Sequence, residues 1–129
     1  MALRTNLEGY AYAAMRVVIG FLFLFHGLQK LFGMYGGQTA TLMSLRGAAG
    51  VIELVGGVLV MVGLFTTPVA FVCSGQMAVA YFMAHAPKGP WPIANAGELA
   101  SLYCFVFLYI SARGGGPLSM DRMVRGKKG

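Results

Sequence analysis

The chain has 129 residues, of which 57% are hydrophobic and 11% are charged, and its formal net charge is +6. A soluble domain carries about 25% charged residues, and a small globule needs them because much of its area faces water. The composition therefore excludes an ordinary soluble domain and indicates a membrane protein.

Half of the positively charged residues lie at the C-terminal end. A basic segment directly after an apolar one is typical of a cytoplasmic flank that faces anionic lipid. We therefore expect the chain to contact membrane lipid and not nucleic acid. Five of the ten Lys and Arg residues lie at or after the end of the last apolar segment: Arg113, Arg122, Arg125, Lys127 and Lys128.

The first apolar segment covers residues 10–32. It is longer than the about 7–15 apolar residues of a secretory signal peptide, so it is predicted to remain as a transmembrane helix. A break rich in Gly and Thr follows over 33–45, and a second helix is predicted over 46–65. Each segment is close to the ~20 residues that cross a bilayer.

Thr66, Thr67 and Pro68 predict a tight turn, with Pro68 in the first turn of a third helix over 68–86. The prolines between 87 and 92 exclude a helix there. A fourth helix is predicted over 95–113, followed by a basic tail over 114–129. The expected fold is all-α, with one domain over 1–129 built as an antiparallel bundle of four transmembrane helices.

Four helices would place both termini on the same side of the membrane. The side richer in Lys and Arg is the cytoplasmic one, which predicts cytoplasmic termini. The basic residues on the side of the termini are Arg4 and the five C-terminal ones, and those on the opposite side are Lys30, Arg46 and Lys88.

Several ionisable and amide side chains lie within the apolar segments. Such residues cost several kcal/mol in a bilayer and mark functional positions when they occur. His26, Gln29 and Lys30 are spaced as one helix face, and Glu53 lies on a stripe of small residues, so it should face a packed neighbour. The alternating topology brings most of these residues to the outer half of the membrane. The predicted catalytic residues are His26, Lys30, Glu53, His85 and Glu98, and the predicted cofactor-binding residues are Arg16, Gln29, Gln76, Asn95 and Tyr103.

Pairing of opposite charges is expected within this cluster, because a nearby cation stabilises a buried carboxylate. Lys30 should pair with Glu53 or Glu98, and the other carboxylate should bond to a histidine or to Asn95. Arg16 lies about 15 Å deeper along its helix than His26. Alternatively, Lys30, Arg16 and His85 serve only as interfacial residues.

No metal site is predicted, because di-iron bundles use Glu-x-x-His pairs, and the chain has none. A mononuclear site with ligands from separate helices is the alternative, although the spacing gives it no specific support. Cys73 and Cys104 lie in separate apolar segments without a C-x-x-C motif. Buried free cysteine is common, so packing is the expected role. A disulfide between helices or a redox-active thiol pair is the alternative.

These motifs together resemble the DoxX family of small bacterial membrane proteins. The similar segments are RVVIGFLFLFHGLQKLFG (16–33), GVIELVGGVLVMVGLFTTPVA (50–70), NAGELASLYCFVFLYI (95–110) and GGGPLSMD (114–121). The resemblance implies a four-helix bundle in the bacterial inner membrane, with quinone-linked or thiol-redox complexes as its setting. The residues shared with the family pattern are Arg16, His26, Gly27, Lys30, Glu53, Gly56, Gly57, Glu98 and Asp121.

The leading functional hypothesis is a membrane subunit of a redox complex that binds a quinone in the outer half of the bundle. His26, Lys30 or His85 would donate hydrogen bonds to it, and Glu53 and Glu98 would relay protons. Phe25, Tyr81, Phe82 and Tyr103 are candidates for an apolar ring site. No haem, flavin or iron–sulfur motif is found, so a partner protein would supply the electrons. Alternatives are a non-enzymatic assembly subunit and a proton-coupled carrier acting as a homo-oligomer.

Overall fold

The computed structural model describes residues 2–36, 39 and 43–125, and every regular element in this part of the chain is helical. The fold class is therefore all-α, as predicted. Lys127 and Lys128 of the predicted tail, and residues 37–38 and 40–42 of the Gly- and Thr-rich break, lie outside the described residues. The α-helices are α1 (Ala2–Phe32), α2 (Leu45–Val62), α3 (Thr66–Ala80), α4 (Pro92–Asn95), α5 (Glu98–Arg113) and α6 (Met120–Arg125).

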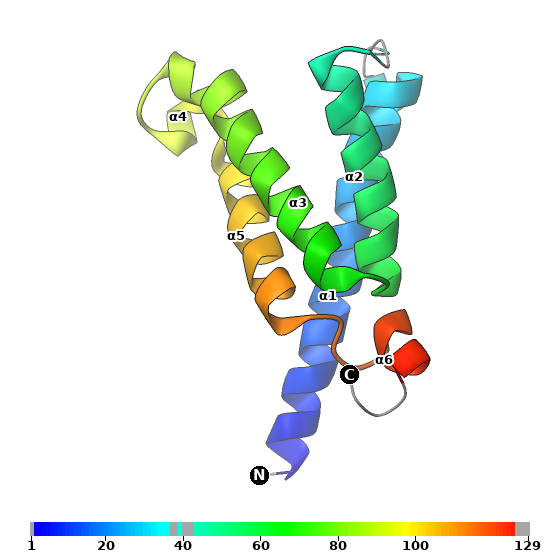
Figure 1. The fold of residues 1–129 in the computed structure, drawn as a ribbon. Coiled ribbons are helices and arrows are strands. Elements are labelled where there is room, and N and C mark those ends of the chain that lie inside the picture. Colours follow the sequence, from blue (N-terminus) through cyan, green and yellow to red (C-terminus); the bar gives the residue numbers. More distant parts are fainter. Residues whose placement is uncertain (1, 37–38, 40–42, 126–129) are drawn as a thin grey trace.

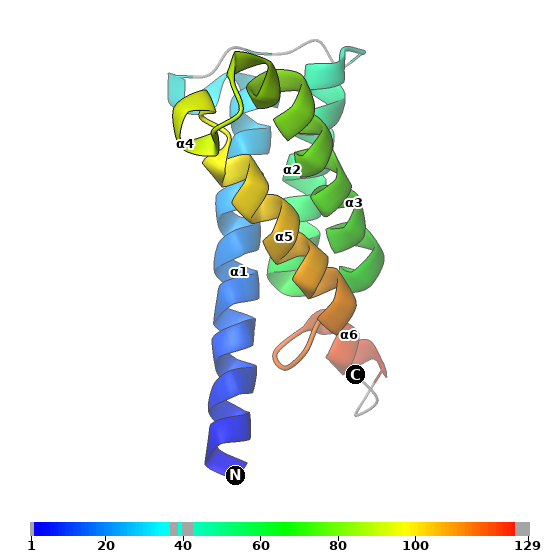
Figure 2. The same ribbon diagram turned by 90° about the vertical axis from the view of Figure 1, so that its left-hand side faces the viewer.

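Two pairs of long helices form the body of the molecule. One pair is α1 with α2, and the other is α3 with α5 (Figure 1). The pairs lie close together where α2 turns into α3, and they diverge toward the end that carries α4 (Figures 1 and 2). Phe23 of α1 packs against Tyr103 and Phe107 of α5, with ring centroids 5.2 and 4.7 Å apart. This aromatic contact joins the two pairs at mid-length.

Small residues allow α1 and α2 to touch backbone to backbone. A Cβ added at Gly27 would lie 2.5 Å from the backbone N of Leu54, and one added at Gly57 would lie 2.7 Å from the N of Leu24. Because lipid tails are as apolar as Leu, such close packing is a main source of helix association in membranes. The glycine-rich stripe predicted on the second helix is therefore its contact with the first.

The Gly27→Ala variant should lower the free energy of unfolding by about 1–3 kcal/mol, because the new methyl group meets backbone that cannot move aside. Gly75→Ala is the matched control, since a Cβ at Gly75 meets nothing within 4 Å. Unfolding in mixed detergent micelles would measure both. Equal midpoints for the two variants would contradict the close packing of α1 and α2.

Some predicted helix boundaries were wrong. The first helix begins at Ala2 rather than near residue 10, and its first turns carry good helix formers such as Leu3 and Glu8. The third continues as a π-helical turn, Tyr81–His85, and a 3₁₀ turn, Ala86–Lys88. The expectation that the proline-rich stretch contains no helix also fails, because α4 begins at Pro92, and the first helical position tolerates proline.

Three helical stretches in the described residues are long and apolar enough to cross a membrane: Asn6–Phe32, Leu45–Val62 and Thr66–Lys88. The chain is thus a multi-pass membrane protein. The fourth predicted span is shorter than expected. α5 has 16 residues, just below the about 17–25 residues that usually span the hydrocarbon core.

The segment after α5 is not a free basic tail over its described part. It folds back so that α6 lies beneath the turn between α2 and α3 (Figure 1). The N–H of Asp121 donates to the carbonyl of Gly63 at 2.8 Å. The Asp121 carboxylate accepts from the N–H groups of Phe65 and Thr66 at 2.8 and 2.9 Å, so it caps the N-terminus of α3 from a distant part of the chain.

The capping bonds also change the acidity of Asp121. Partial burial by itself raises the pKa of this carboxyl, but the hydrogen bonds from Thr66 and Phe65 and the nearby charge of Arg125 outweigh it. The pKa of Asp121 is consequently lowered from its usual value. The cap is therefore in its charged form at neutral pH.

Candidate functional site

A buried ion pair lies near the C-terminus of α1 and the N-terminal part of α2, at the end of the molecule where the helix pairs diverge (Figure 1). The Nζ of Lys30 lies 2.5 Å from the Oε2 of Glu53. Glu53 is fully buried, whereas about a quarter of the Lys30 side chain is exposed. Of the two carboxylates predicted as partners of Lys30, the structure selects Glu53. The close contact of α1 and α2 at Gly27 and Gly50 brings these side chains together.

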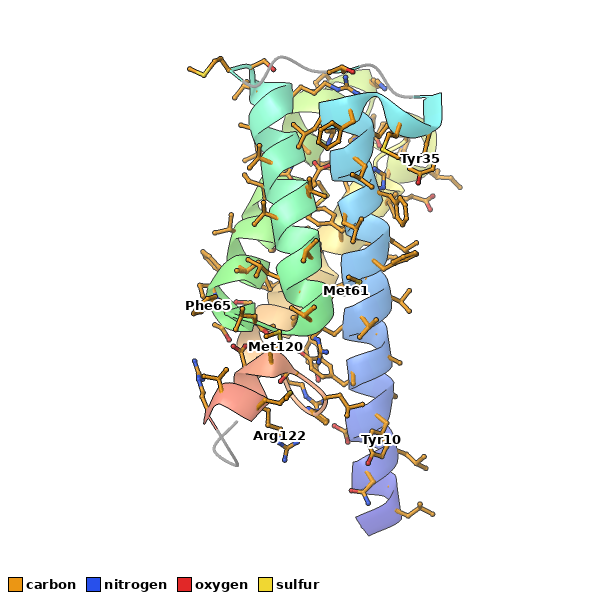
Figure 3. The ribbon with its side chains drawn as sticks, turned by 90° about the vertical axis from the view of Figure 1, so that its right-hand side faces the viewer. Tyr10, Tyr35, Met61, Phe65, Met120 and Arg122 are labelled. Atoms are coloured by element: carbon orange, nitrogen blue, oxygen red, sulfur yellow. The ribbon has the colours of Figure 1, made fainter. Side chains whose placement is uncertain are left out.

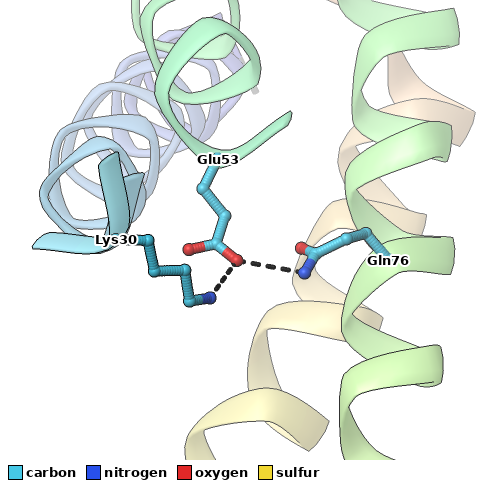
Figure 4. A network of polar contacts seen from close by, with 3 residues as sticks. All are labelled: Lys30, Glu53 and Gln76. Atoms are coloured by element: carbon cyan, nitrogen blue, oxygen red, sulfur yellow. Dashed lines mark hydrogen bonds and ion pairs between the residues drawn. The ribbon is translucent and has the colours of Figure 1, made fainter. Parts of the chain in front are cut away.

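Gln76 of α3 extends this pair across the gap between the two helix pairs. Its Nε2 donates to the same Glu53 Oε2 at 3.0 Å (Figure 4). Two neighbouring acceptor atoms, Glu53 Oε1 and Gln76 Oε1, are buried and have no hydrogen-bond partner among the described residues. Buried polar atoms without partners cost roughly 1–3 kcal/mol each. A ligand, a water molecule or a proton bound at this cluster would therefore supply the hydrogen bonds that these two oxygens lack.

A cavity of about 380 Å³ adjoins the cluster. It combines a carboxylate, an ammonium group and imidazoles with an aromatic ring in an otherwise apolar lining. The polar and aromatic residues of its wall are His26, Lys30, Glu53, His85, Tyr103 and Phe23, and the rest of the wall is made of Ala, Leu and Met.

The loop before α5 holds one wall of this cavity in place. The Nδ1 of His85 lies 3.1 Å from the carbonyl oxygen of Asn95. The Asn95 side chain is fully buried. Its Nδ2 donates to Tyr81 Oη and to the carbonyl of Gly89, and its Oδ1 accepts from the N–H of Gly97. Asn95 therefore fixes the loop and the position of His85, and it does not line the cavity.

A second, open hollow of about 490 Å³ lies on the other side of His26. Phe25, Gln29 and Tyr35 line it, and Gln29 donates to the carbonyl of Tyr35 at 3.2 Å. Figure 3 shows Tyr35 at this end of the molecule. The two hollows share His26, Leu99 and Tyr103 as wall residues, and the rings of His26 and Tyr103 meet edge to face at 5.9 Å.

Several predicted site residues thus lie elsewhere. Gln29 is one residue, or about 100° of helix rotation, from Lys30, so the single face expected for His26, Gln29 and Lys30 is split between two hollows. Glu98 is exposed at the first turn of α5 and does not line the cavity. No hydrogen bond from Glu98 to a histidine or Asn95 is found in the described structure, contrary to the expected pairing.

The aromatic residues predicted for a ring site also separate. Tyr103 lines the cavity and Phe25 the second hollow, whereas Phe82 is 70% exposed and faces outward. The pattern missed Phe23, because an apolar residue in an apolar helix carries no signal of its own. Its position three residues before His26 is the only pointer, since that spacing places both on one face.

Arg16 lies at the opposite end of the protein and is 1% exposed. Its Nε donates to the carbonyl of Val60 at 3.0 Å, and its Nη1 donates to that of Gly115 at 2.7 Å. Further bonds run to the carbonyls of Met61, Pro117 and Leu118. Arg16 therefore caps the C-terminal end of α2 and fastens the chain after α5.

The cysteines are free in this structure. Cys73 is buried and Cys104 is half-buried, and the hydroxyl of Ser74 donates to the carbonyl of Cys104 at 2.7 Å. No group of three His, Cys, Asp or Glu side chains in the described part of the chain is placed to hold a metal ion.

Comparison of the sequence with known proteins identifies the family to which the chain is similar. Residues 11–86 match the DoxX family, and this range includes His26, Lys30, Glu53, Gln76 and His85. A protein of Haemophilus influenzae that is described only as uncharacterized is 44% identical, with the match covering 90% of this chain and 94% of the relative. No solved structure matches.

Proposed function

The chain belongs to the DoxX family of membrane proteins, and on this basis we propose that it is the membrane subunit of a redox complex that binds a quinone ring in the cavity beside Glu53. The observation that carries the proposal is the cavity itself. It joins a buried carboxylate, Lys30, His26 and Tyr103 in one apolar enclosure of about 380 Å³.

The residues present fit such a ring. Ligand pockets of this kind usually measure about 300–1,000 Å³, and they combine apolar walls with a few polar groups. Lys30 and His26 offer N–H donors for carbonyl oxygens. The unpartnered Oε1 of Glu53 offers an acceptor for a hydroxyl group of the reduced ring, whereas Gln76 does not line the cavity and acts on the ring only through Glu53.

A bound quinone would supply the redox chemistry, and the electrons would come from a partner protein. The chain's own residues have simpler tasks. Tyr103 and Phe23 would pack against the ring and exclude water. Lys30 and His26 would orient it, and Glu53 would hold a proton close to it. The hollow lined by Phe25 shares a wall with the cavity and offers an apolar path to the bilayer.

The topology that we propose keeps α5 as a fourth span. Its 16 residues are about 24 Å long, and local thinning of the bilayer accommodates a short helix at modest cost. With both termini on one side, the greater number of Lys and Arg there favours a cytoplasmic location for them. The cavity then faces the outer half of the bacterial inner membrane.

Glu53→Gln should weaken binding of a short-tailed quinol by about tenfold, because a charge-assisted hydrogen bond is replaced by a neutral one. Binding of the purified protein in mild detergent would be measured by titration, with both the oxidised and the reduced ring. The expected result for native protein also includes a quinone in its organic extract, identified by mass spectrometry.

Glu98→Gln is the matched control, since it removes the same charge from an exposed site outside the cavity. It should change the affinity by less than about twofold. The proposal fails if no quinone is extracted and none binds, or if the Glu98 variant loses as much affinity as the Glu53 variant. The affinities are compared only if both variants unfold at the same midpoint as the native protein.

A second candidate function is a non-enzymatic assembly subunit. The observation that favours it is the position of Glu53, which ties together α1, α2 and α3 through Lys30 and Gln76. A structural role predicts that Glu53→Gln lowers recovery of the protein or its complex while redox turnover per recovered complex stays constant. A fall in turnover at constant recovery supports the quinone site instead.

A further inference from the structure

A second enclosed polar cavity lies at the opposite end of the protein from Glu53. Its volume is about 200 Å³, and its walls are the start of α3, the end of α5, the 114–116 loop and α6. Figure 3 shows Phe65, Met120 and Arg122 at this end, far from Tyr35. At about 30 Å³ per water, the cavity has room for several waters or one tetrahedral group.

The charges around this cavity are mainly positive. Three arginines line it, Arg113, Arg122 and Arg125, against one carboxylate, Asp121. The carboxylate oxygens of Asp121 are already engaged by the N–H groups that they cap. Arg113 lies 3.3 Å from an exposed Glu8 oxygen. Neither Arg122 nor Arg125 makes an ion pair within the described residues, so their charge is available to an anion.

The side chain of Thr66 provides an independent observation. Thr66 is 1% exposed and lines the cavity, and its hydroxyl oxygen has no hydrogen-bond partner among the described residues. A buried hydroxyl without a partner is costly. Thr66 lies at the first position of α3, whose N-terminus is already capped by the Asp121 carboxylate, so the Thr66 hydroxyl is the donor that this end of the helix leaves for a ligand.

The loop between α5 and α6 offers backbone donors. The carbonyls of Gly114 and Gly115 accept from Tyr12 Oη and Arg16 Nη1, respectively. In a trans peptide the N–H points opposite to the carbonyl. The N–H groups of Gly115 and Gly116 therefore point away from α1, and both residues line the cavity. Consecutive N–H groups of this kind form anion-binding concavities.

We propose that this cavity binds a phosphate group, held by the guanidinium groups of Arg122 and Arg125, the hydroxyl of Thr66 and the glycine-loop N–H groups. Arginine is the side chain best suited to phosphate oxygens. The phosphate could be the headgroup of an anionic phospholipid or a phosphate ion in solution. The site would bind the phosphate group of either source through the same donors, and the experiment below distinguishes the two sources.

The test uses the whole protein in a non-ionic detergent with two probes, dihexanoyl phosphatidylglycerol and inorganic phosphate. Binding is followed by native mass spectrometry and by the rise in unfolding temperature. Arg122→Gln should raise the dissociation constant about fivefold, as expected for one arginine beside an anionic headgroup. Thr66→Val, which removes the hydroxyl at constant shape, should raise it by about the same factor.

Arg4→Gln is the matched control, because Arg4 is an exposed arginine of α1 that does not line the cavity. It should change the dissociation constant by less than about twofold. Binding of the lipid alone identifies a headgroup site, and binding of inorganic phosphate with the same dependence on the variants identifies a soluble ligand. The proposal is overturned if neither probe binds. It is also overturned if Arg4→Gln weakens binding as much as Arg122→Gln while Thr66→Val has no effect, because diffuse charge would then explain the result.

Discussion

Replacing Arg16 by lysine is expected to lower the free energy of unfolding by about 2–4 kcal/mol, although the charge is kept. The guanidinium group of Arg16 donates in several directions at once, to Val60 and Met61 at the end of α2 and to the loop after α5. A lysine ammonium is a single point and cannot reach both groups of carbonyls. The variant should therefore release the segment containing α6 from its place beneath α2.

Chemical or detergent-induced unfolding would measure the loss, and proteolysis of the C-terminal segment would locate it. Arg122→Lys serves as the control, since Arg122 is exposed on α6 and its side chain makes no hydrogen bond to a carbonyl in the described structure. If Arg16→Lys unfolds at the same midpoint as the native protein, Arg16 does not hold the two segments together.

Replacing Lys30 by methionine should cost about 2–3 kcal/mol of stability. Removing one partner of a buried ion pair costs about 3–5 kcal/mol, and the partial exposure of Lys30 reduces that figure. The loss arises because the fully buried Glu53 is left without a cation. The double variant Lys30→Met, Glu53→Gln removes the stranded charge and should recover stability to within about 1 kcal/mol of the native protein.

Lys88→Met is the control for this pair, because Lys88 is an exposed lysine at the same end of the protein. It should have little effect on unfolding. If Lys30→Met is as stable as Lys88→Met, or if the double variant is no better than the single one, Lys30 is an interfacial residue and not the partner of a buried carboxylate.

The two polar sites of this protein differ in construction. The cavity beside Glu53 depends on side chains of the diverging helix pairs, with Glu53 at the point where three helices meet. The cavity beside Thr66 depends on backbone groups and on the segment that folds back after α5. Phe23, Tyr103 and Phe107 lie between them in an apolar layer. A perturbation of one site therefore has no direct polar route to the other.

Helix spacing and side-chain chemistry reduced the predicted partners of Lys30 to two carboxylates, Glu53 and Glu98. Glu53 lies on a stripe with Gly50 and Gly57, and small residues in a membrane helix mark its contact face. A carboxylate on that face needs a cation, and Lys30 is at the matching depth of the preceding helix. The structure confirms the contact face, and of the two predicted partners it selects Glu53.

The same reasoning failed for residues that were assigned to the site only because they lie at the same depth in the membrane. Glu98 has the right depth, but the loop fixed by Asn95 starts α5 in an orientation that leaves Glu98 exposed. Gln29 also has the right depth, yet it points into a different hollow from Lys30. Spacing along one helix gives relative directions on that helix, and it does not give the rotation of the helix against its neighbours.

The sequence by itself determined that the chain crosses a membrane and is all-helical, because the length and apolarity of a segment decide whether it is stable in lipid. It also determined the contact face of the glycine-rich helix. Only the tertiary structure decided which polar residues share a cavity, that Arg16 and Asp121 serve as caps for α2 and α3, and that the segment after α5 folds back. These outcomes depend on hydrogen bonds between backbone groups and residues about 45–100 positions away. No local sequence pattern predicts partners that are so distant along the chain.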